Sequence, residues 1–200
     1  MKITFMGNCQ TLALCYYFQQ LQYSNASWIC YGEEMKRVII PRKWRGLFIK
    51  PNHWSDKCKN KIFNYLDQIE EIQKSDVIIY QEISTEKSYI CNTKLIKELC
   101  KTSCRLIKLP CIYLEYYDYD NSIKELQARE LANSVDICVS KIFERFRDQN
   151  MLLTKNHPNT FLFMQIVEEL CSQLNIPFFS EERLRVFLQN NNYIDLPFVL

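Results

Sequence analysis

The chain has 200 residues, 48% of them hydrophobic, with 25 basic and 23 acidic side chains and a formal net charge of +2. This length and apolar content fit one compact domain with a sizeable core, and we expect a single α/β domain over residues 1–200. The near balance of charge argues against a general nucleic-acid-binding protein, and no apolar run reaches the ~20 residues that a membrane-spanning helix needs.

Ten cysteines are a high count for this length, but their spacing is irregular. The chain opens with a strand-like run and not with the pattern of a signal peptide. We therefore expect a cytoplasmic protein whose cysteines are mostly reduced and buried. Cys100, Cys104 and Cys111 are close in sequence, but no CxxC pair or neighbouring histidine accompanies them, so we predict no metal site.

Apolar runs and helical periodicity alternate along the first 115 residues, and residues 120–190 are mainly helical in pattern. The alternation predicts a three-layer α/β sandwich with a central parallel sheet, helices on both faces and a helical C-terminal portion. The segment 36–56 has no clear pattern, because prolines interrupt its apolar stretches. The expected strands are 2–6, 27–31, 76–80 and 105–109, and the expected helices are 9–23, 58–73, 92–102, 122–134, 136–148, 158–174 and 181–190.

Cys9 lies where the first strand passes into the first helix, after a glycine that permits a sharp turn. Backbone N–H groups and the positive end of the helix dipole at this position stabilise a thiolate. The same N–H groups can hold an anion or an oxyanion. Cys9 is therefore a candidate nucleophile or ligand contact. The alternative is a small buried apolar residue, which is the usual role of a free cysteine.

Ligands of open parallel sheets bind beyond the carboxyl ends of the strands, so the residues that follow each strand are of interest. Gly7–Gln10 follow the first strand, Gly32 the second and Gln81 the third. Pro110 and the aromatic–acidic run 113–120 follow the fourth. We expect these segments to converge at one edge of the sheet. The aromatic run can stack on a sugar or adenine ring, or it can be a partly buried loop.

His157 precedes a proline that fits the first turn of a helix, so we predict that His157 lies at or next to the helix N-cap. The positive helix end disfavours the imidazolium, and a neutral ring suits a general base. The alternative is a histidine that only caps the helix. We expect the other histidine, His53, at the surface. Cys9 and His157 together have the composition of a nucleophile–base pair.

Four short segments resemble, in the same order, motifs of the WcbI family of polysaccharide-biosynthesis proteins. They are Gly7-Asn8-Cys9-Gln10, the run Asp76 to Gln81, Leu109-Pro110 followed by Tyr113 to Tyr117, and Asn156-His157-Pro158, and the similarity spans about residues 1–176. The resemblance implies an α/β fold related in layout to SGNH/GDSL esterases and to flavodoxin-like proteins. It also implies coenzyme A binding and acetyl transfer to a capsule sugar.

In that comparison Cys9 replaces the nucleophilic serine, His157 is the base, and Gln81 and Gly32 are donors near the oxyanion hole. The expected cofactor-binding residues are Gly7, Asn8, Gln10, Gly32, Arg42, Lys43 and Arg45, and the expected substrate-binding residues are Tyr113, Glu115, Tyr116 and Tyr117. The basic residues at 36–45 can hold phosphates, or they can form an ordinary solvated face. One departure is Thr154, which occupies the position of the acid in a DxxH motif, so we look to Glu82 or Asp118 as the acidic orienter.

Three hypotheses follow. The first is an acyltransferase that moves an acyl group from acetyl-CoA to a sugar or polysaccharide hydroxyl, with Cys9 as nucleophile or as a residue that contacts the thioester. The second is an ester or thioester hydrolase at the same site, with water as acceptor. The third is a non-catalytic module that binds a nucleotide or a glycan. The expected partners are a small-molecule acyl donor and a carbohydrate acceptor, and no nucleic acid.

Overall fold

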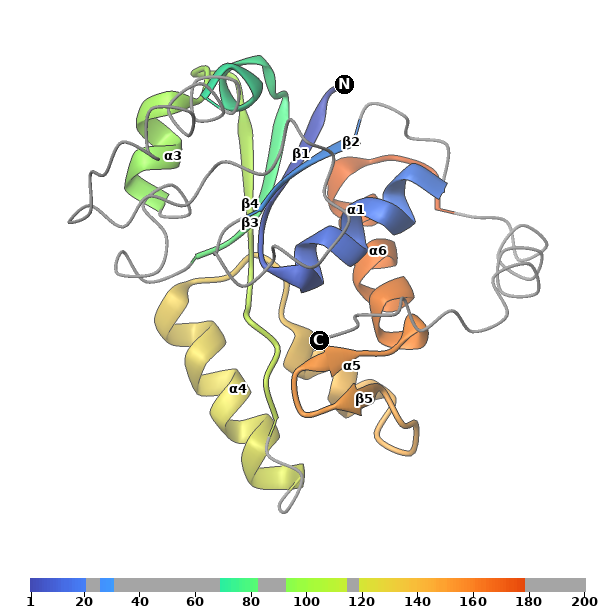
Figure 1. Ribbon diagram of the computed structural model, residues 1–200. Coiled ribbons are helices and arrows are strands. Elements are labelled where there is room, and N and C mark those ends of the chain that lie inside the picture. Colours follow the sequence, from blue (N-terminus) through green and yellow to red (C-terminus); the bar gives the residue numbers. More distant parts are fainter. Residues whose placement is uncertain (21–25, 31–68, 83–92, 115–118, 179–200) are drawn as a thin grey trace, which may run out of the picture.

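The structure is a computed structural model that describes residues 1–20, 26–30, 69–82, 93–114 and 119–178. Its centre is a sheet of four parallel strands in the order β2-β1-β3-β4 (Figure 1). Ile3 pairs with Ala26 on one side and with Val77 on the other, and Val77 pairs with Arg105. The strands are β1 (Ile3–Gly7), β2 (Ala26–Cys30), β3 (Val77–Gln81) and β4 (Arg105–Leu109).

Helices cover both faces of this sheet. In Figure 1, α1 (Cys9–Gln20) and α6 (Thr160–Leu174) lie on one face, and α3 (Thr93–Leu99) and the helical segment 69–74 lie on the other. The arrangement confirms an α/β fold with a central parallel sheet and is consistent with three layers. The remaining elements are α4 (Tyr119–Asn133), α5 (Val139–Arg145) and a small antiparallel pair, β5 (Leu152–Thr154) and β6 (His157–Pro158).

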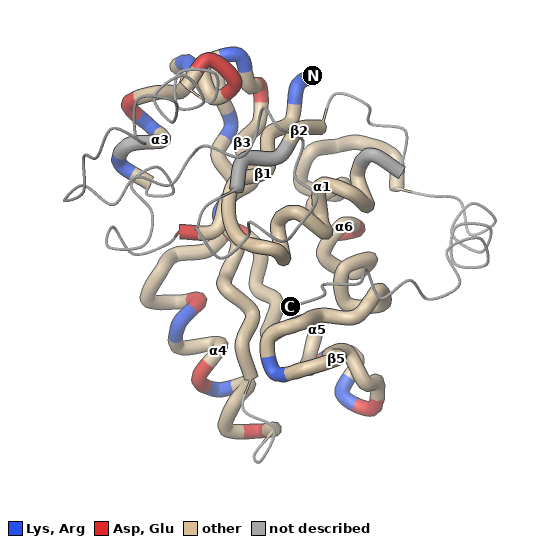
Figure 2. The backbone as a smooth tube through the Cα atoms, viewed as in Figure 1, with Lys and Arg blue, Asp and Glu red and all other residues tan. Residues whose placement is uncertain are grey.

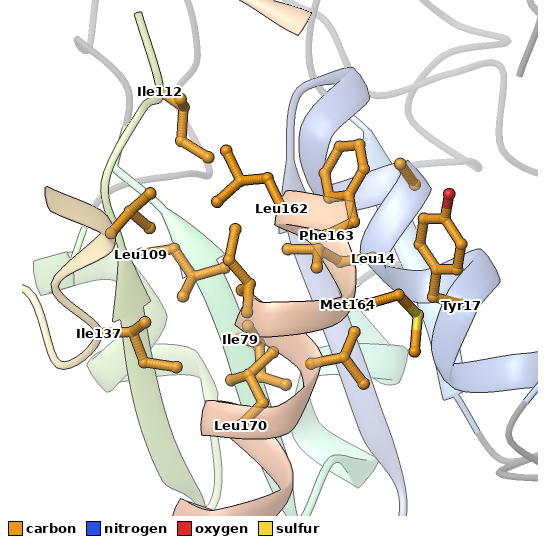
Figure 3. Packing of buried hydrophobic residues seen from close by; sticks show 14 of the residues in the cluster. Leu14, Tyr17, Ile79, Leu109, Ile112, Ile137, Leu162, Phe163, Met164 and Leu170 are labelled. Carbon is orange, nitrogen blue, oxygen red and sulfur yellow. The ribbon is translucent and has the colours of Figure 1, made fainter. Parts of the chain in front are cut away.

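Side-chain alternation along the strands divides the core between the two faces. Phe5 and Ile79 belong to a buried cluster with residues of α1 and α6, whereas Met6 and Ile78 point to the opposite face and are also fully buried. Figure 3 shows α6 laid across the strands, with Leu162 and Leu170 among its core side chains. Each such fully buried side chain contributes about 1.5–3 kcal/mol, so this packing fixes α1 and α6 against the sheet.

The charge pattern separates buried from exposed helices. α1 has no charged residue, whereas basic and acidic residues alternate along α4 (Figure 2). This difference agrees with the packing of α1 into the core and with the exposure of much of α4. Over the described residues, no helix is long and apolar enough to cross a membrane.

The four observed strands lie within one residue of the expected ones. The helix expected over 158–174 begins at Thr160, because the Asn159 side chain accepts a hydrogen bond from the Leu162 N–H at 3.0 Å and caps it. The β5–β6 pair was not expected. The expected segments 36–56 and 181–190, and most of 58–73, lie outside the described residues.

Candidate functional site

The strand order places a topological switch point between β1 and β3. The chain leaves β1 for β2 on one side and reaches β3 on the other, so the carboxyl ends of β1 and β3 border the crevice where open parallel sheets bind ligands. Gly7 ends β1, Cys9 begins α1, and Gln81 ends β3. These three of the residues that the sequence singled out are therefore at this edge.

The turn from β1 into α1 requires a glycine. Gly7 has a φ of +152°, and a Cβ at this position would lie 2.9 Å from Thr11 Cγ2, 2.9 Å from Thr11 Oγ1 and 3.2 Å from Gln81 Cβ. An L side chain rarely adopts this backbone conformation and would meet atoms on two sides. The close approach brings the first turn of α1 against the end of β3.

Asn8 caps α1. Its Oδ1 accepts from the Gln10 N–H at 2.8 Å, and its carbonyl oxygen accepts from the N–H groups of Thr11 at 3.1 Å and Leu12 at 3.2 Å. From Cys9 to Leu12, the Cys9 N–H is thus the only one without such a bond to Asn8. The set of N–H groups available to an anion here is smaller than the sequence suggested.

The Cys9 thiol is half-buried, and its environment raises its pKa. Burial is the largest cause and the nearby Cys111 thiol adds to it, whereas the N–H groups of Cys9 and Gln10 lower the pKa by less. The expectation of a thiolate stabilised by the helix end is therefore corrected. Cys9 is protonated at neutral pH, so its use as a nucleophile requires a base.

Two buried glutamines join the segments around Cys9. Gln10 Nε2 donates to the carbonyl oxygens of Ile112 and Asn156, both at 2.8 Å. Gln10 Oε1 accepts from Gln81 Nε2 at 2.8 Å and from the Ile112 N–H at 3.1 Å. All four hydrogen-bonding positions of the Gln10 amide are thus used, and they tie α1 to β3, to the segment after β4 and to the segment before His157.

Gln81 was expected to donate to an oxyanion. The Nε2 amide of Gln81 already donates two hydrogen bonds, one to Gln10 Oε1 and one to the Pro110 carbonyl oxygen, both at 2.8 Å. Its Oε1 is buried without a hydrogen-bond partner, and an oxygen cannot donate. In this geometry Gln81 positions Gln10 and has no N–H left for a reacting oxygen.

His157 lies in β6, and its place differs from the expected helix cap, which Asn159 provides. The His157 ring is half-buried, and its Nδ1 is 2.5 Å from Thr154 Oγ1. The Thr154 hydroxyl also donates to Asn156 Oδ1 at 3.1 Å. The threonine at the DxxH position therefore contacts the ring at Nδ1, where a DxxH motif would place an acid.

Glu82 and Asp118 were the expected acidic orienters. The Glu82 carboxylate instead accepts from the Lys108 ammonium and from the N–H and hydroxyl of Thr93, at 3.2 and 3.1 Å. Burial raises its pKa, but the hydrogen bonds from Lys108 and Thr93 outweigh burial and lower it overall. Asp118 lies outside the described residues.

A hydrogen bond from a side chain to a main-chain oxygen joins the two candidate catalytic segments. The carbonyl oxygen of Asn156 accepts from the side chain of Gln10, so the residue after Cys9 is bonded to the residue before His157. The Leu114 N–H donates to the Lys155 carbonyl oxygen at 2.7 Å, which holds the same segment against the chain that follows β4. Cys9 and His157 thus flank one hydrogen bond at the switch point.

Cys111 lies next to the site, although the sequence indicated it only as part of a cysteine cluster and not as a site residue. It is exposed, its Sγ is 3.7 Å from Asn8 Nδ2, and it raises the pKa of Cys9. Its position directly after Pro110, at the carboxyl end of β4, was the available signal. Within the described ranges, no three His, Cys, Asp or Glu side chains gather as metal ligands.

The expected substrate and coenzyme residues are only partly described. The Tyr113 carbonyl oxygen accepts from Arg129 Nη2 at 2.5 Å, and Lys155 Nζ lies 5.0 Å from the centre of the Tyr113 ring. These contacts place Tyr113 next to α4 and next to the turn between β5 and β6. The other residues in this group lie outside the described residues: Gly32, Arg42, Lys43, Arg45, His53, Glu115, Tyr116 and Tyr117.

A solved structure shares this fold. It superposes with a TM-score of 0.59 at 13% sequence identity, over 91% of this chain and 71% of the other. That protein is described as WcbI, a polysaccharide biosynthesis enzyme, in its native form without a disulfide bond between coenzyme A and one of its cysteines. No family model matches the chain, and no curated protein sequence matches it. The match supports the expected WcbI-like fold, and the SGNH/GDSL layout stays a prediction.

Proposed function

We propose that this protein is an acyltransferase that moves an acyl group from a coenzyme A thioester, with acetyl-CoA as the expected donor, to a hydroxyl of a sugar or polysaccharide. The observation that carries the proposal is the hydrogen bond from Gln10 to the Asn156 carbonyl oxygen. It joins the residue after Cys9 to the residue before His157, next to the edge where this sheet topology binds ligands, which supports the pairing of a thiol with an imidazole base.

In the proposed reaction His157 takes the Cys9 proton as the Sγ attacks the thioester carbonyl carbon. The Cys9 N–H and Asn8 Nδ2 stabilise the oxyanion; the present contact of Asn8 Nδ2 with a sulfur at 3.7 Å is long and weak, so a better acceptor can replace it. The coenzyme A thiolate then leaves and takes the proton from His157. The acceptor hydroxyl gives its proton to His157 as its oxygen attacks the acyl-cysteine carbonyl carbon. The bond to Cys9 Sγ then breaks, and Sγ takes the proton back from His157, which restores the thiol and the neutral imidazole.

The raised pKa of Cys9 favours a second route at the same site. His157 would take the proton directly from the acceptor hydroxyl, whose oxygen attacks the bound thioester. The protonated Cys9 would then contact the acyl group without bonding to it. The two routes differ in a single observable, an acyl group on Cys9.

The description of WcbI supports coenzyme A as the donor's carrier, since it concerns a disulfide between coenzyme A and a cysteine of that protein. On this chain, Cys9 and Cys111 are the described thiols nearest the switch point. Treatment with coenzyme A disulfide is expected to form a mixed disulfide at Cys9, mapped by peptide mass spectrometry. Cys100 is a matched control because it follows α3, towards the amino-terminal end of β4, away from the switch point.

The test is thermal unfolding with and without coenzyme A, with ATP as the control ligand. Coenzyme A at ~100 times its dissociation constant should add about 2.7 kcal/mol, which raises the midpoint by a few degrees at this size. A rise with coenzyme A beyond the rise with ATP supports the proposal and justifies a screen of sugar acceptors. Equal or absent shifts would contradict the coenzyme assignment.

Acetyl-CoA then separates the two routes. Intact-mass measurement of the protein after brief mixing should show one added acetyl group if Cys9 is acylated, and Cys9→Ala should abolish turnover with its fold retained. If turnover survives in Cys9→Ala but is lost in His157→Gln, the direct route is correct. Turnover retained by both variants would contradict the assignment of this site.

A further inference from the structure

Among the described residues, a neutral hydroxyl contacts Nδ1 of the His157 ring, from the position that an acid occupies in a DxxH motif. Thr154 Oγ1 is 2.5 Å from His157 Nδ1 and 3.1 Å from Asn156 Oδ1. These two contacts join three side chains within one short turn between β5 and β6, whose register is irregular at this place.

We infer that Thr154, with Asn156, is a positioning pair that holds the neutral His157 ring in the tautomer with its proton on Nδ1. A threonine hydroxyl has one proton to donate and two lone pairs that accept. Asn156 Oδ1 is a pure acceptor, so the hydroxyl proton lies on that bond. The short contact to Nδ1 then requires Nδ1 to be the donor, and the lone pair of the ring is on Nε2.

This tautomer is the one that a general base acting through Nε2 needs. Carboxylates in this role fix the tautomer and also stabilise the imidazolium. Thr154 and Asn156 fix the tautomer and carry no charge of their own. The Asn156 main chain is itself held by Gln10, which ties the positioning pair to the residue next to Cys9.

The test is nitrogen-15 NMR of the histidine rings. The chain has two histidines, so a His53→Gln background leaves His157 as the sole signal. Long-range nitrogen–proton correlations, recorded well above the ordinary histidine pKa of about 6.5, report which ring nitrogen is protonated. We expect a proton on Nδ1 in this background and in Thr154→Ser, which keeps the hydroxyl. We expect a shift towards a proton on Nε2 in Thr154→Val and in Asn156→Ala.

Thr154 and Asn156 are exposed, so these substitutions leave the core intact, and the backbone carbonyl that Gln10 binds is retained in Asn156→Ala. A proton on Nε2 in the His53→Gln background would overturn the inference, since the amide of Asn156 would then be the donor. An unchanged tautomer in Thr154→Val would overturn it too, because another group would be fixing the ring.

The catalytic consequence rests on the proposed function, whereas the NMR result does not. If both hold, Thr154→Val lowers kcat for acyl transfer by about a hundredfold, within the range that a positioned base contributes. The KM for the acyl-CoA stays unchanged, and Thr154→Ser restores most of kcat. An Nδ1 proton without any acyl transfer would leave the inference standing and would refute the proposed function alone.

Discussion

Gly7 is the residue with the least freedom to change at the switch point. With a φ of +152° and Thr11 atoms 2.9 Å from any added Cβ, Gly7→Ala strains the backbone and displaces the first turn of α1. We expect a loss of about 1–3 kcal/mol in the free energy of unfolding, measured by urea denaturation.

A second substitution separates backbone strain from the clash. Thr11→Ala removes the two atoms nearest to the added Cβ, at the cost of the hydrogen bond from the Thr11 hydroxyl to the Asn8 carbonyl oxygen at 2.8 Å. If the clash contributes to the loss, the double variant should lose less free energy of unfolding than the two single variants lose in sum. Strict additivity would contradict the steric explanation.

Cys9 and Cys111 are coupled through their charges. Burial is the larger cause of the raised Cys9 pKa and Cys111 the next, so Cys111→Ser should lower that pKa. The measurement is the rate of Cys9 alkylation by iodoacetamide against pH, resolved by peptide. Cys138→Ser is the matched control, because that thiol lies at the start of α5. An unchanged profile in Cys111→Ser would contradict the proximity of the two thiols.

At the scale of elements, the amides of Gln10 and Gln81 join α1 and β3 to the segments around residues 112 and 156. Replacing either with Met leaves buried partners unpaired, each at a cost of about 1–3 kcal/mol. Because the two side chains share a hydrogen bond, a double-mutant cycle should give a coupling energy of about 0.5–3 kcal/mol. A control cycle of Gln10 with Gln127, which bonds Glu144 on α5, should be additive. Additivity of Gln10 with Gln81 would contradict the network.

α4 and α5 are joined by a buried carboxylate. Glu130 is 3% exposed, accepts from the Ser140 N–H at 3.1 Å, and also accepts from the Ser140 hydroxyl. Burial raises its pKa above the ordinary value of 4.5, although the hydrogen bonds from Ser140 and Val139 oppose this. The folded chain therefore binds this proton at a pH where the unfolded chain has already lost it.

It follows that this group makes the free energy of unfolding decrease as pH rises from 4.5 through the raised pKa. Glu130→Gln removes that contribution. The difference in free energy of unfolding between Glu130→Gln and the wild type, measured with urea, should therefore change across this pH range. Glu125→Gln, which removes an exposed carboxylate from the same helix, is the matched control for the loss of one negative charge. A wild-type-like slope in Glu130→Gln would contradict the raised pKa.

The elements differed in how well the sequence predicted them. The strands were placed within one residue because parallel strands covered on both faces are continuous apolar runs, such as Val77–Tyr80. The β5–β6 pair was missed because a two-residue strand has no periodicity. Consequently Pro158 was assigned to a helix, although it pairs with Leu152 and the helix begins after Asn159.

At the scale of the whole molecule, the candidate site is assembled from segments that are up to 146 residues apart. The sequence indicated Cys9 and His157 because each lies within two positions of a residue that marks the start of an expected helix, Gly7 or Pro158. It could not indicate that Gln10 donates a hydrogen bond to Asn156, since that contact depends on the tertiary packing of two distant segments. It also predicted the wrong sign for the Cys9 pKa, because burial is a property of the packed molecule and outweighs the helix end.

The central claim is that coenzyme A binds over Cys9 at the switch point, and the most direct measurement is the protection of that thiol. The rate of Cys9 alkylation, resolved by peptide mass spectrometry, is compared with and without saturating coenzyme A, with ATP as control ligand and Cys100 as internal reference. We predict that coenzyme A slows alkylation of Cys9 at least about tenfold, by occluding the thiol, and leaves Cys100 unchanged. Equal rates at Cys9 with and without coenzyme A would contradict the account.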